Sequence, residues 1–319
     1  MRDLHVPWWL AGATVAIAIT LSFKGAYAAS LMNLVAIAAL IAASMRFVLL
    51  IGELSFATSA FVGLGAYGAG IATALFDWPF PVALILGPLA VIVVSALFGY
   101  VTLRIKGPYF MLIGFAFTEA VRISFTKVNA IGGVTGLPGI FPPQFLDSWM
   151  PTFVALVVIG LLFGLYAVEK SDFGKTLVAI RDNEDIARTV GVDVLAFKVA
   201  CFVIASFCAG VAGSLQAFVN NVISPSDFGF LVASFALAYV KIGGESSIFG
   251  AITGAIFLSL LGSYALGFGA GEHFIYGGAM VLAMLLMPKG FIGLFATLRA
   301  RYSRPAKATP LAAKPVAAQ

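Results

Sequence analysis

Long runs of apolar residues, each close to the length of a bilayer-spanning helix, occupy most of this 319-residue chain. A hydrocarbon layer of about 30 Å is crossed by roughly 20 mostly apolar residues in a helix. By this length criterion the chain contains about ten crossings, near residues 8–23, 31–51, 57–76, 81–103, 108–125, 151–169, 197–219, 225–242, 248–266 and 273–288. We therefore predict an all-α integral membrane protein whose transmembrane domain covers residues 1–300.

The composition agrees with this class and excludes others. Apolar residues make up 61% of the chain and charged residues 10%, whereas soluble domains hold about 45–50% and about 25%. The net charge of +5 does not indicate nucleic-acid binding, because the basic residues lie between apolar runs rather than on one polar face. A chain with two histidines is not expected to hold a histidine-based metal site. Cys201 and Cys208 lie too far apart along one helix to form a disulfide and are expected in the core.

The placement of basic residues predicts the orientation. If the N- and C-termini are both cytoplasmic, nearly all Lys and Arg residues fall on the cytoplasmic side, and only Lys24, Arg122 and Lys127 fall toward the outside. The interval 126–150 is then a periplasmic loop, and the polar interval 170–197 is a cytoplasmic loop. The Ala-, Pro- and Lys-rich stretch 301–319 is expected to be a disordered cytoplasmic tail.

The run near 225–242 is short for a crossing, but its start carries helix-capping residues. Ser224, Pro225 and Asp227 fit an N-cap, a first-turn proline and the acid of a capping box. A helix from that point has about 18 residues and spans roughly 27 Å. We therefore predict one continuous crossing here.

Glycines are clustered in ways that allow helix backbones to approach closely. They are Gly63, Gly65, Gly68 and Gly70 in the third run, and the spaced pairs Gly160/Gly164 and Gly250/Gly254. Close helix packing explains any single one of them. Four in one helix leave either a very tight helix contact or a surface open to a small solute.

Two charged residues, Glu119 and Arg122, lie three apart within or at the outer end of an apolar run. Charges inside a membrane are costly and usually face the interior of the bundle or a water-filled path. A local ion pair is the simpler interpretation, and contact with a solute is the alternative.

The polar interval after residue 169 predicts two short helices outside the membrane. Asn183 is a suitable N-cap, Glu184 and Asp185 follow in the first turn, Arg188 is in the last turn, and Gly191 follows the end. Ile186, Ala187 and Val190 form a small apolar face, as do Phe173, Leu177 and Ile180 just before. These faces dock either on the protein's own helix ends or on a cytoplasmic partner.

The interval also contains Phe173-Gly174-Lys175-Thr176, which ends like a phosphate-binding loop. That motif needs a glycine five residues before Gly174, where this chain has Glu169. The interval therefore holds no such loop, and any ATP that the protein uses must bind another chain. No set of catalytic residues is apparent either, so the chain is not expected to be an enzyme.

Short motifs follow one another in a fixed order between about residues 30 and 294. They are the Gly-Glu-Leu-Ser-Phe and glycine-rich stretch at 52–67, the basic turn at 103–110, the Glu/Arg segment at 117–122, the polar stretch at 174–192, and the shorter matches at 209–213, 223–225, 243–250 and 288–290. This series resembles the permeases of branched-chain amino-acid ABC transporters. The resemblance is closest to their LivM-type inner-membrane subunit.

The resemblance implies an ABC importer permease fold in the bacterial inner membrane and a set of partners. These partners are two cytoplasmic ATP-binding cassette subunits that hold ATP and Mg, a second homologous permease subunit and a periplasmic solute-binding protein. No cofactor is expected on this chain. The resemblance also implies that the polar interval is the ATPase-coupling segment, with Phe173, Gly174, Arg181, Asn183, Glu184, Asp185, Ile186, Ala187, Val190 and Gly191 as its candidate residues.

We expect a permease subunit that forms a translocation path for branched-chain or related amino acids. Small and hydroxyl-bearing residues suit a neutral path for a zwitterion. The candidates are Ser55, Thr58, Ser59, Gly63, Gly65, Tyr109 and Glu119. A urea- or amide-type ABC permease is an alternative. A second alternative is an ion-coupled secondary transporter, which would need acidic residues deep in the membrane or broken helices.

Overall fold

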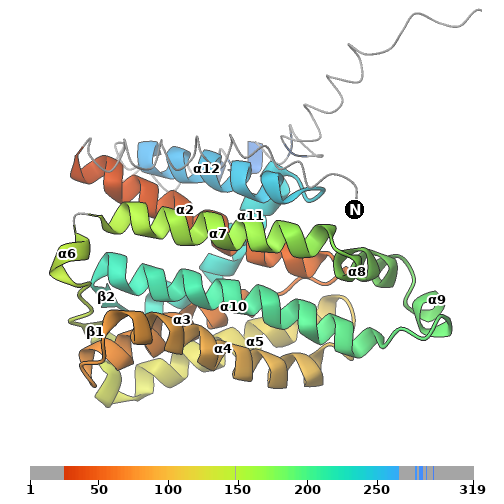
Figure 1. Cartoon of the computed structure of the whole chain (residues 1–319), viewed down its shortest axis with the longest axis horizontal. Helices are drawn as coiled ribbons and strands as arrows, with labels where there is room; N and C mark the ends of the chain where they lie inside the picture. The colour runs from red at the N-terminus through yellow and green to blue at the C-terminus, as the bar shows by residue number, and fades with distance from the viewer. Residues whose placement is uncertain are drawn as a thin grey trace, which may run out of the picture.

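A computed structural model describes residues 25–147 and 149–265, together with positions 277, 278, 280–282, 285 and 290. The predicted crossing at 8–23 and the predicted tail at 301–319 lie outside the described residues. So does most of the crossing at 273–288, whose described positions are helical. The described chain is a bundle of roughly aligned helices (Figure 1).

Eight longer helices match eight of the predicted crossings within a few residues. They are α2 (Ala26–Leu49), α3 (Thr58–Ala74), α4 (Phe80–Thr102), α5 (Pro108–Lys127), α7 (Met150–Lys170), α10 (Val194–Asn220), α11 (Phe230–Gly243) and α12 (Ile248–Ala265). Six of them, all except α3 and α11, are long and apolar enough to cross a membrane. The described residues therefore form a multi-pass, all-α membrane protein.

Shorter elements lie at the two ends of the bundle (Figure 1). At one end are α8 (Asp172–Asp182) and α9 (Glu184–Thr189), and we refer to this as the α8–α9 end. At the other end, β1 (Leu137–Pro138) pairs antiparallel with β2 (Val222–Ile223), near α6 (Gln144–Asp147). The 3-10 turns η1 (Asn129–Ile131) and η2 (Gly133–Thr135) belong to the same loop as β1.

The prediction of one continuous helix over 225–242 is wrong. The capping box of Ser224 and Asp227 is present, but it closes a single 3-10 turn, η3 (Pro225–Phe228). Gly229 then adopts an extended conformation, with φ −77° and ψ −178°, and α11 begins only at Phe230. An α-helix of 14 residues is about 21 Å long, shorter than a hydrocarbon layer. The single predicted helix is therefore divided into η3 and α11.

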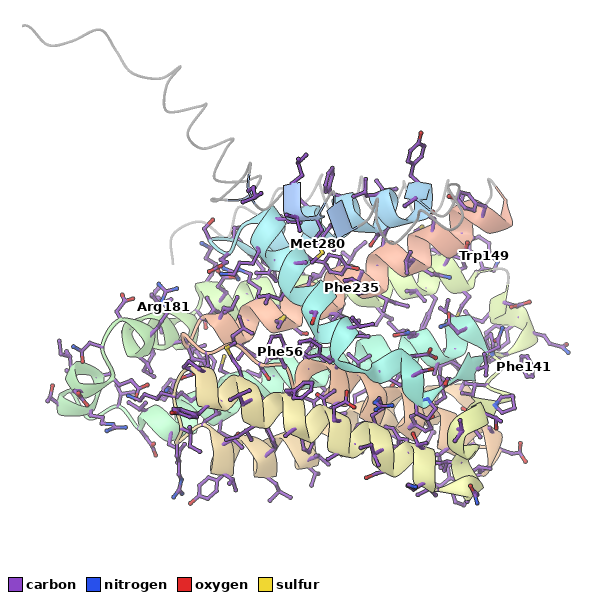
Figure 2. All side chains as sticks on the ribbon, turned by 180° about the vertical axis from the view of Figure 1, so that it is seen from behind. Phe56, Phe141, Trp149, Arg181, Phe235 and Met280 are labelled. Carbon is purple, nitrogen blue, oxygen red and sulfur yellow. The ribbon has the colours of Figure 1, made fainter. Side chains whose placement is uncertain are left out.

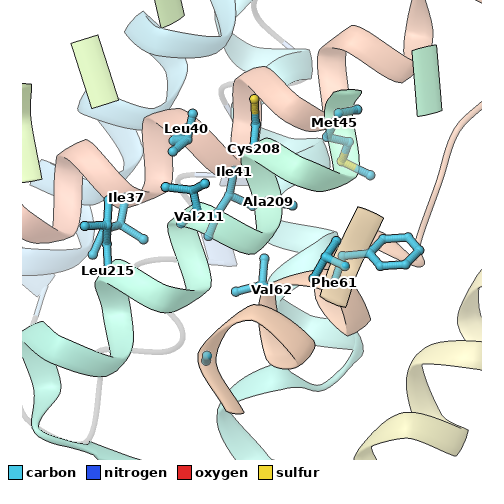
Figure 3. Packing of buried hydrophobic residues seen from close by; sticks show 14 of the residues in the cluster. Ile37, Leu40, Ile41, Met45, Phe61, Val62, Cys208, Ala209, Val211 and Leu215 are labelled. Atoms are coloured by element: carbon cyan, nitrogen blue, oxygen red, sulfur yellow. The ribbon is translucent and has the colours of Figure 1, made fainter. Parts of the chain in front are cut away.

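The core forms where α10 lies between α2 and α3 (Figure 3). On one side of α10, Val211 and Leu215 face apolar residues of α2, including Ile37 and Leu40. On the other side α3 approaches so closely that helix backbones touch. A Cβ atom on Gly65 would meet the backbone of Gly210. Glycine is required there because any side chain would separate the two helices.

The spaced glycine pairs behave differently from one another. Gly250 and Gly254 of α12 lie against the backbone of α11, at Gly244 and Tyr239, so the predicted close packing is confirmed there. Gly160 and Gly164 of α7 have no atom within 4 Å of the position of a Cβ. Within the described residues this second pair makes no helix contact.

We expect Gly65→Leu to lower the thermal stability of the purified protein, because the new side chain would overlap the Gly210 backbone, which cannot rotate aside. Overpacking typically costs about 1–3 kcal/mol. Gly164→Leu is the matched control, since the same side chain enters open space and should leave the melting temperature nearly unchanged. Equal melting temperatures for the two variants would contradict the packing role of Gly65.

Candidate functional site

Two connections between helices meet inside the bundle. One is the stretch of residues 50–57 between α2 and α3, and the other is the stretch of residues 221–229 between α10 and α11. The buried hydroxyl of Ser59 joins them, because its Oγ lies 2.9 Å from the carbonyl oxygen of Phe228 and 2.8 Å from that of Gly229. The starts of α3 and α11 are thereby in contact. We call residues 55–59 and 228–230 the helix-break junction.

Helix α5 closes one side of the helix-break junction. Thr118 of α5 donates a hydrogen bond of 2.9 Å to the carbonyl oxygen of Phe56, a backbone group in the connection between α2 and α3. Phe56 also makes an edge-to-face contact with Phe230, with ring centroids 5.0 Å apart. Phe56 lies beside both α5 and α11 (Figure 2). Phe115 of α5 packs on Phe230 from outside, so the junction has an aromatic outer wall.

Glu119 and Arg122 form the predicted ion pair on α5, with Arg122 Nη2 2.7 Å from Glu119 Oε2. Their side chains are 27% and 35% exposed, respectively. The stem of Arg122 passes Gly229 of the junction, with its Cδ 3.7 Å from the position of a Cβ there. A partly exposed ion pair on a membrane helix is costly against lipid. This face of α5 is therefore suited to protein or water.

Most of the predicted path residues come together at the junction. The Ser55 hydroxyl is buried and has no hydrogen-bond partner among the described residues. Thr58 donates to the carbonyl oxygen of Ser55 at 3.0 Å. Gly63 faces Phe228, whose Cβ is 3.0 Å from the position of a Cβ on the glycine.

Two of the predicted path residues lie elsewhere. Gly65 faces α10, as described above. Tyr109 is an exposed residue in the first turn of α5. It lies nine residues before Thr118, or about 14 Å along the helix.

The predicted helix caps of the polar interval are present. The Asn183 side chain accepts hydrogen bonds from the backbone N–H groups of Asp185 and Ile186, at 3.0 and 3.1 Å. Gly191 follows the helix with φ +86°, a conformation that favours glycine. The residues of α9 divide into two sides. Ala187 packs inward, whereas Ile186 and Val190 are 62% and 78% exposed. The sequence had grouped all three on one face.

The other predicted coupling residues hold α8 and α9 against the bundle. Phe173 stacks on Phe197 of α10 with centroids 5.3 Å apart. Gly174 lies against the backbone of Glu169 at the end of α7. The stem of Arg181, at the α8–α9 end (Figure 2), passes Gly52 in the α2–α3 connection.

Glu184 is bound by several cations. It forms ion pairs with Lys106 at 2.7 Å and with Lys198, and Arg188 is 3.7 Å away. Burial by itself would raise the pKa of Glu184, but the hydrogen bonds from Lys106 and Lys198 outweigh it and lower the pKa below its usual value. The carboxylate is therefore held in its charged form.

Sequence reasoning missed two buried ion pairs at the α8–α9 end. Lys198 contacts Glu184 and Glu53, and Arg46 binds Glu169 at 2.6 Å. Each of these charges lies at the edge of an apolar run, where it is expected to flank the membrane in solvent. Their burial depends on which connections fold over the helix ends, which the run lengths do not reveal.

Cys201 and Cys208 are buried and unpaired, as predicted. Among the described residues, no group of three or more His, Cys, Asp or Glu residues could hold a metal ion.

The profile of one protein family matches residues 27–287, and that family is described as the permease component of branched-chain amino acid transport systems. The chain belongs to this family. The match covers every described helix except the first residue of α2. Both the helix-break junction and the polar interval therefore lie within it.

Individual relatives agree with this family. The high-affinity branched-chain amino acid permease LivM of Escherichia coli is 28% identical over 73% of this chain and 62% of its own length. BraD of Pseudomonas aeruginosa, also named a high-affinity branched-chain amino acid permease, is 26% identical over 76% of this chain and 87% of its own. The xylose permease XylH of Escherichia coli is 32% identical, but over only 35% of this chain and 30% of its own. The chain thus spans less than two thirds of LivM. No solved structure matches it.

Proposed function

We propose that this chain is the permease subunit of an ATP-binding cassette importer for branched-chain amino acids in the bacterial inner membrane. The family match over residues 27–287 and the names of LivM and BraD support this. The single structural observation that supports it best is α9, a short capped helix outside the long apolar helices whose Ile186 and Val190 side chains are exposed. An exposed apolar surface of this kind is suited to a protein partner, which an ATP-driven importer needs and a secondary transporter working alone does not.

The proposed topology has ten crossings with both termini cytoplasmic. The α8–α9 end is then cytoplasmic, and the β1–β2 end, with the loop 126–150, is periplasmic. The concentration of basic residues at the α8–α9 end supports this orientation. They include Arg46, Lys106, Lys175, Arg181, Arg188 and Lys198. In this arrangement α3 and α11 count as crossings whose connections enter the bundle.

The proposed translocation path passes along the exposed face of α5 and over the helix-break junction, where a second, homologous permease subunit covers it. Ser55, Thr58, Ser59, Gly63 and Glu119 belong to this path, with Tyr109 nearer its cytoplasmic mouth. The α5 face is largely unburied within this chain and carries the Glu119–Arg122 pair, which favours a protein partner over lipid. We assign Gly65 to helix packing instead, because its open side is filled by α10.

The proposed coupling contact is the outward side of α9. Ile186 and Val190 are exposed apolar residues on a short capped helix, a shape suited to a groove on an ATP-binding cassette subunit. The two ATPase subunits bind ATP and Mg, and this chain binds no cofactor. A periplasmic solute-binding protein delivers the amino acid at the β1–β2 end and supplies the affinity.

The test is uptake by the complete complex, purified from its native membrane and reconstituted in proteoliposomes with its binding protein. We expect labelled leucine to accumulate only when ATP is enclosed with the ATPase subunits. Xylose and urea serve as competing solutes. Accumulation of xylose or urea in place of leucine, or leucine entry that is unchanged without ATP, would overturn the proposal.

A further inference from the structure

One lysine in the described chain is buried with its charge at the base of a membrane helix. Lys198 lies in the first turns of α10 and its side chain is only 2% exposed. Its ammonium group pairs with Glu184 of α9 and lies 4.0 Å from Oε1 of Glu53, in the α2–α3 connection. A buried ammonium group is tolerated only when carboxylates neutralise it. Lys198 therefore holds α9 and the α2–α3 connection together.

Both carboxylates are in turn fixed to the start of α5. Glu53 Oε2 accepts a hydrogen bond of 3.1 Å from the backbone N–H of Gly107, and the second oxygen of Glu184 pairs with Lys106. Gly107 has φ +67° and immediately precedes Pro108, the first residue of α5. The cluster thus touches the α2–α3 connection, in which Glu53 is two residues before Ser55 of the junction, and the start of α5, a helix whose Thr118 contacts Phe56 of the junction.

We propose that Lys198, Glu53 and Glu184 are positioning residues that carry a displacement of α9 to the helix-break junction. This inference rests on the proposed function, in which an ATPase subunit moves α9. If Glu184 moved alone, the buried ammonium group of Lys198 would lose its close carboxylate partner and keep only Glu53, 4.0 Å away, and breaking a buried ion pair is strongly unfavourable. The cluster therefore moves as a unit, and the α2–α3 connection and the start of α5 follow it.

A second buried ion pair at the same end provides a comparison. Arg46 of α2 binds both oxygens of Glu169 of α7, at 2.6 and 2.8 Å, and its Nε donates to the carbonyl oxygen of Glu245. The Arg46 side chain is 2% exposed, like that of Lys198. However, none of the groups that Arg46 binds lies in α9 or at the junction. It joins helix ends without linking the coupling segment to the path.

The experiment compares leucine moved per ATP hydrolysed by the complete complex in proteoliposomes. Lys198→Met should leave assembly with the ATPase subunits intact and basal hydrolysis within about twofold, while lowering the leucine-to-ATP ratio about tenfold. Lys198→Arg should restore most of the ratio. A triple variant with Glu53→Gln and Glu184→Gln should be no worse than Lys198→Met alone, because residues that act as a unit are not additive.

Two control variants separate coupling from stability. Arg46→Met removes the comparison pair and should lower thermal stability without changing the ratio. Lys241→Met removes an exposed lysine near the same end of the bundle and should change neither. A wild-type ratio in Lys198→Met, or an equal fall in Arg46→Met, would overturn the inference. If Lys198→Met does not assemble, Glu53→Gln replaces it, because glutamine keeps an acceptor for the Gly107 N–H. A lowered leucine-to-ATP ratio in Glu53→Gln would support the inference, and a wild-type ratio would overturn it.

The two proposals fail in distinguishable ways. A wild-type complex that hydrolyses ATP without moving leucine would overturn the proposed function, and this inference with it. A wild-type complex that transports leucine, together with an unchanged ratio in Lys198→Met, would overturn this inference alone.

Discussion

Replacing Val190 by glutamate is expected to abolish amino-acid uptake by separating the permease from its ATPase subunit. Val190 is 78% exposed at the end of α9, where a folded chain gains nothing from an apolar side chain. Truncating a hot-spot residue of a docking contact costs about 2 kcal/mol or more, or roughly 30-fold in affinity. A buried, unpaired carboxylate would weaken the contact further. The measurement is co-purification of the ATPase subunits, together with leucine uptake.

The matched control is Val134→Glu. Val134 is 76% exposed in η2, at the opposite end of the bundle, and the same change there should leave ATPase binding intact. Both variants keep the buried side of α9, where Ala187 contacts Ile180 and Val194, so both should fold. If Val190→Glu binds the ATPase subunits as tightly as Val134→Glu does, the outward side of α9 is not the coupling contact.

The helices were predictable because each depends on a local pattern. The lengths of the apolar runs gave most crossings within a few residues, as with 81–103 against Phe80–Thr102. The caps at Asn183 and Gly191 were also predictable from sequence. An asparagine side chain can accept hydrogen bonds from the first N–H groups of a helix, and glycine readily adopts the positive φ that ends one. These features require no knowledge of the rest of the molecule.

The break at Gly229 was not predictable from its own segment. Ser224, Pro225 and Asp227 start a helical turn in either case, and what decides the outcome is Ser59, a residue far away in sequence whose hydroxyl contacts the carbonyl groups of Phe228 and Gly229. These two carbonyl groups have a tertiary partner, so the chain can leave the helix there without burying unpaired polar groups.

The candidate site was recovered in part for a similar reason. Residue type indicated Ser55, Thr58, Ser59 and Gly63, which gather at the junction, but could not separate Gly63 from Gly65 two positions later. Only the neighbours differ, since Gly63 faces Phe228 and Gly65 faces the α10 backbone. Lys198 and Glu53 were missed because their burial is created by α9 and the α4–α5 turn, not by their own segments.

Replacing Gly63 by leucine is expected to abolish uptake while the complex still assembles. A Cβ on Gly63 would lie 3.0 Å from Phe228 Cβ and 3.4 Å from the ring of Phe125, so the added side chain must displace η3. That displacement separates Phe228 and Gly229 from Ser59 and changes the start of α11. The neighbours are side chains, which can shift more easily than the backbone that faces Gly65. Overpacking of about 1–3 kcal/mol should therefore distort the junction without unfolding the bundle.

The measurement is leucine uptake at matched amounts of assembled complex for Gly63→Ala, Gly63→Leu and Gly65→Leu. Gly63→Ala should lose part of the uptake, because a methyl group needs only a small shift of Phe228, and Gly63→Leu should lose nearly all of it while its melting temperature falls less than that of Gly65→Leu. Gly65→Leu should instead lose stability first, since its obstruction is the α10 backbone. Normal uptake by an assembled Gly63→Leu complex would show that displacing η3 and the start of α11 does not affect the solute. These two segments would then not belong to the translocation path.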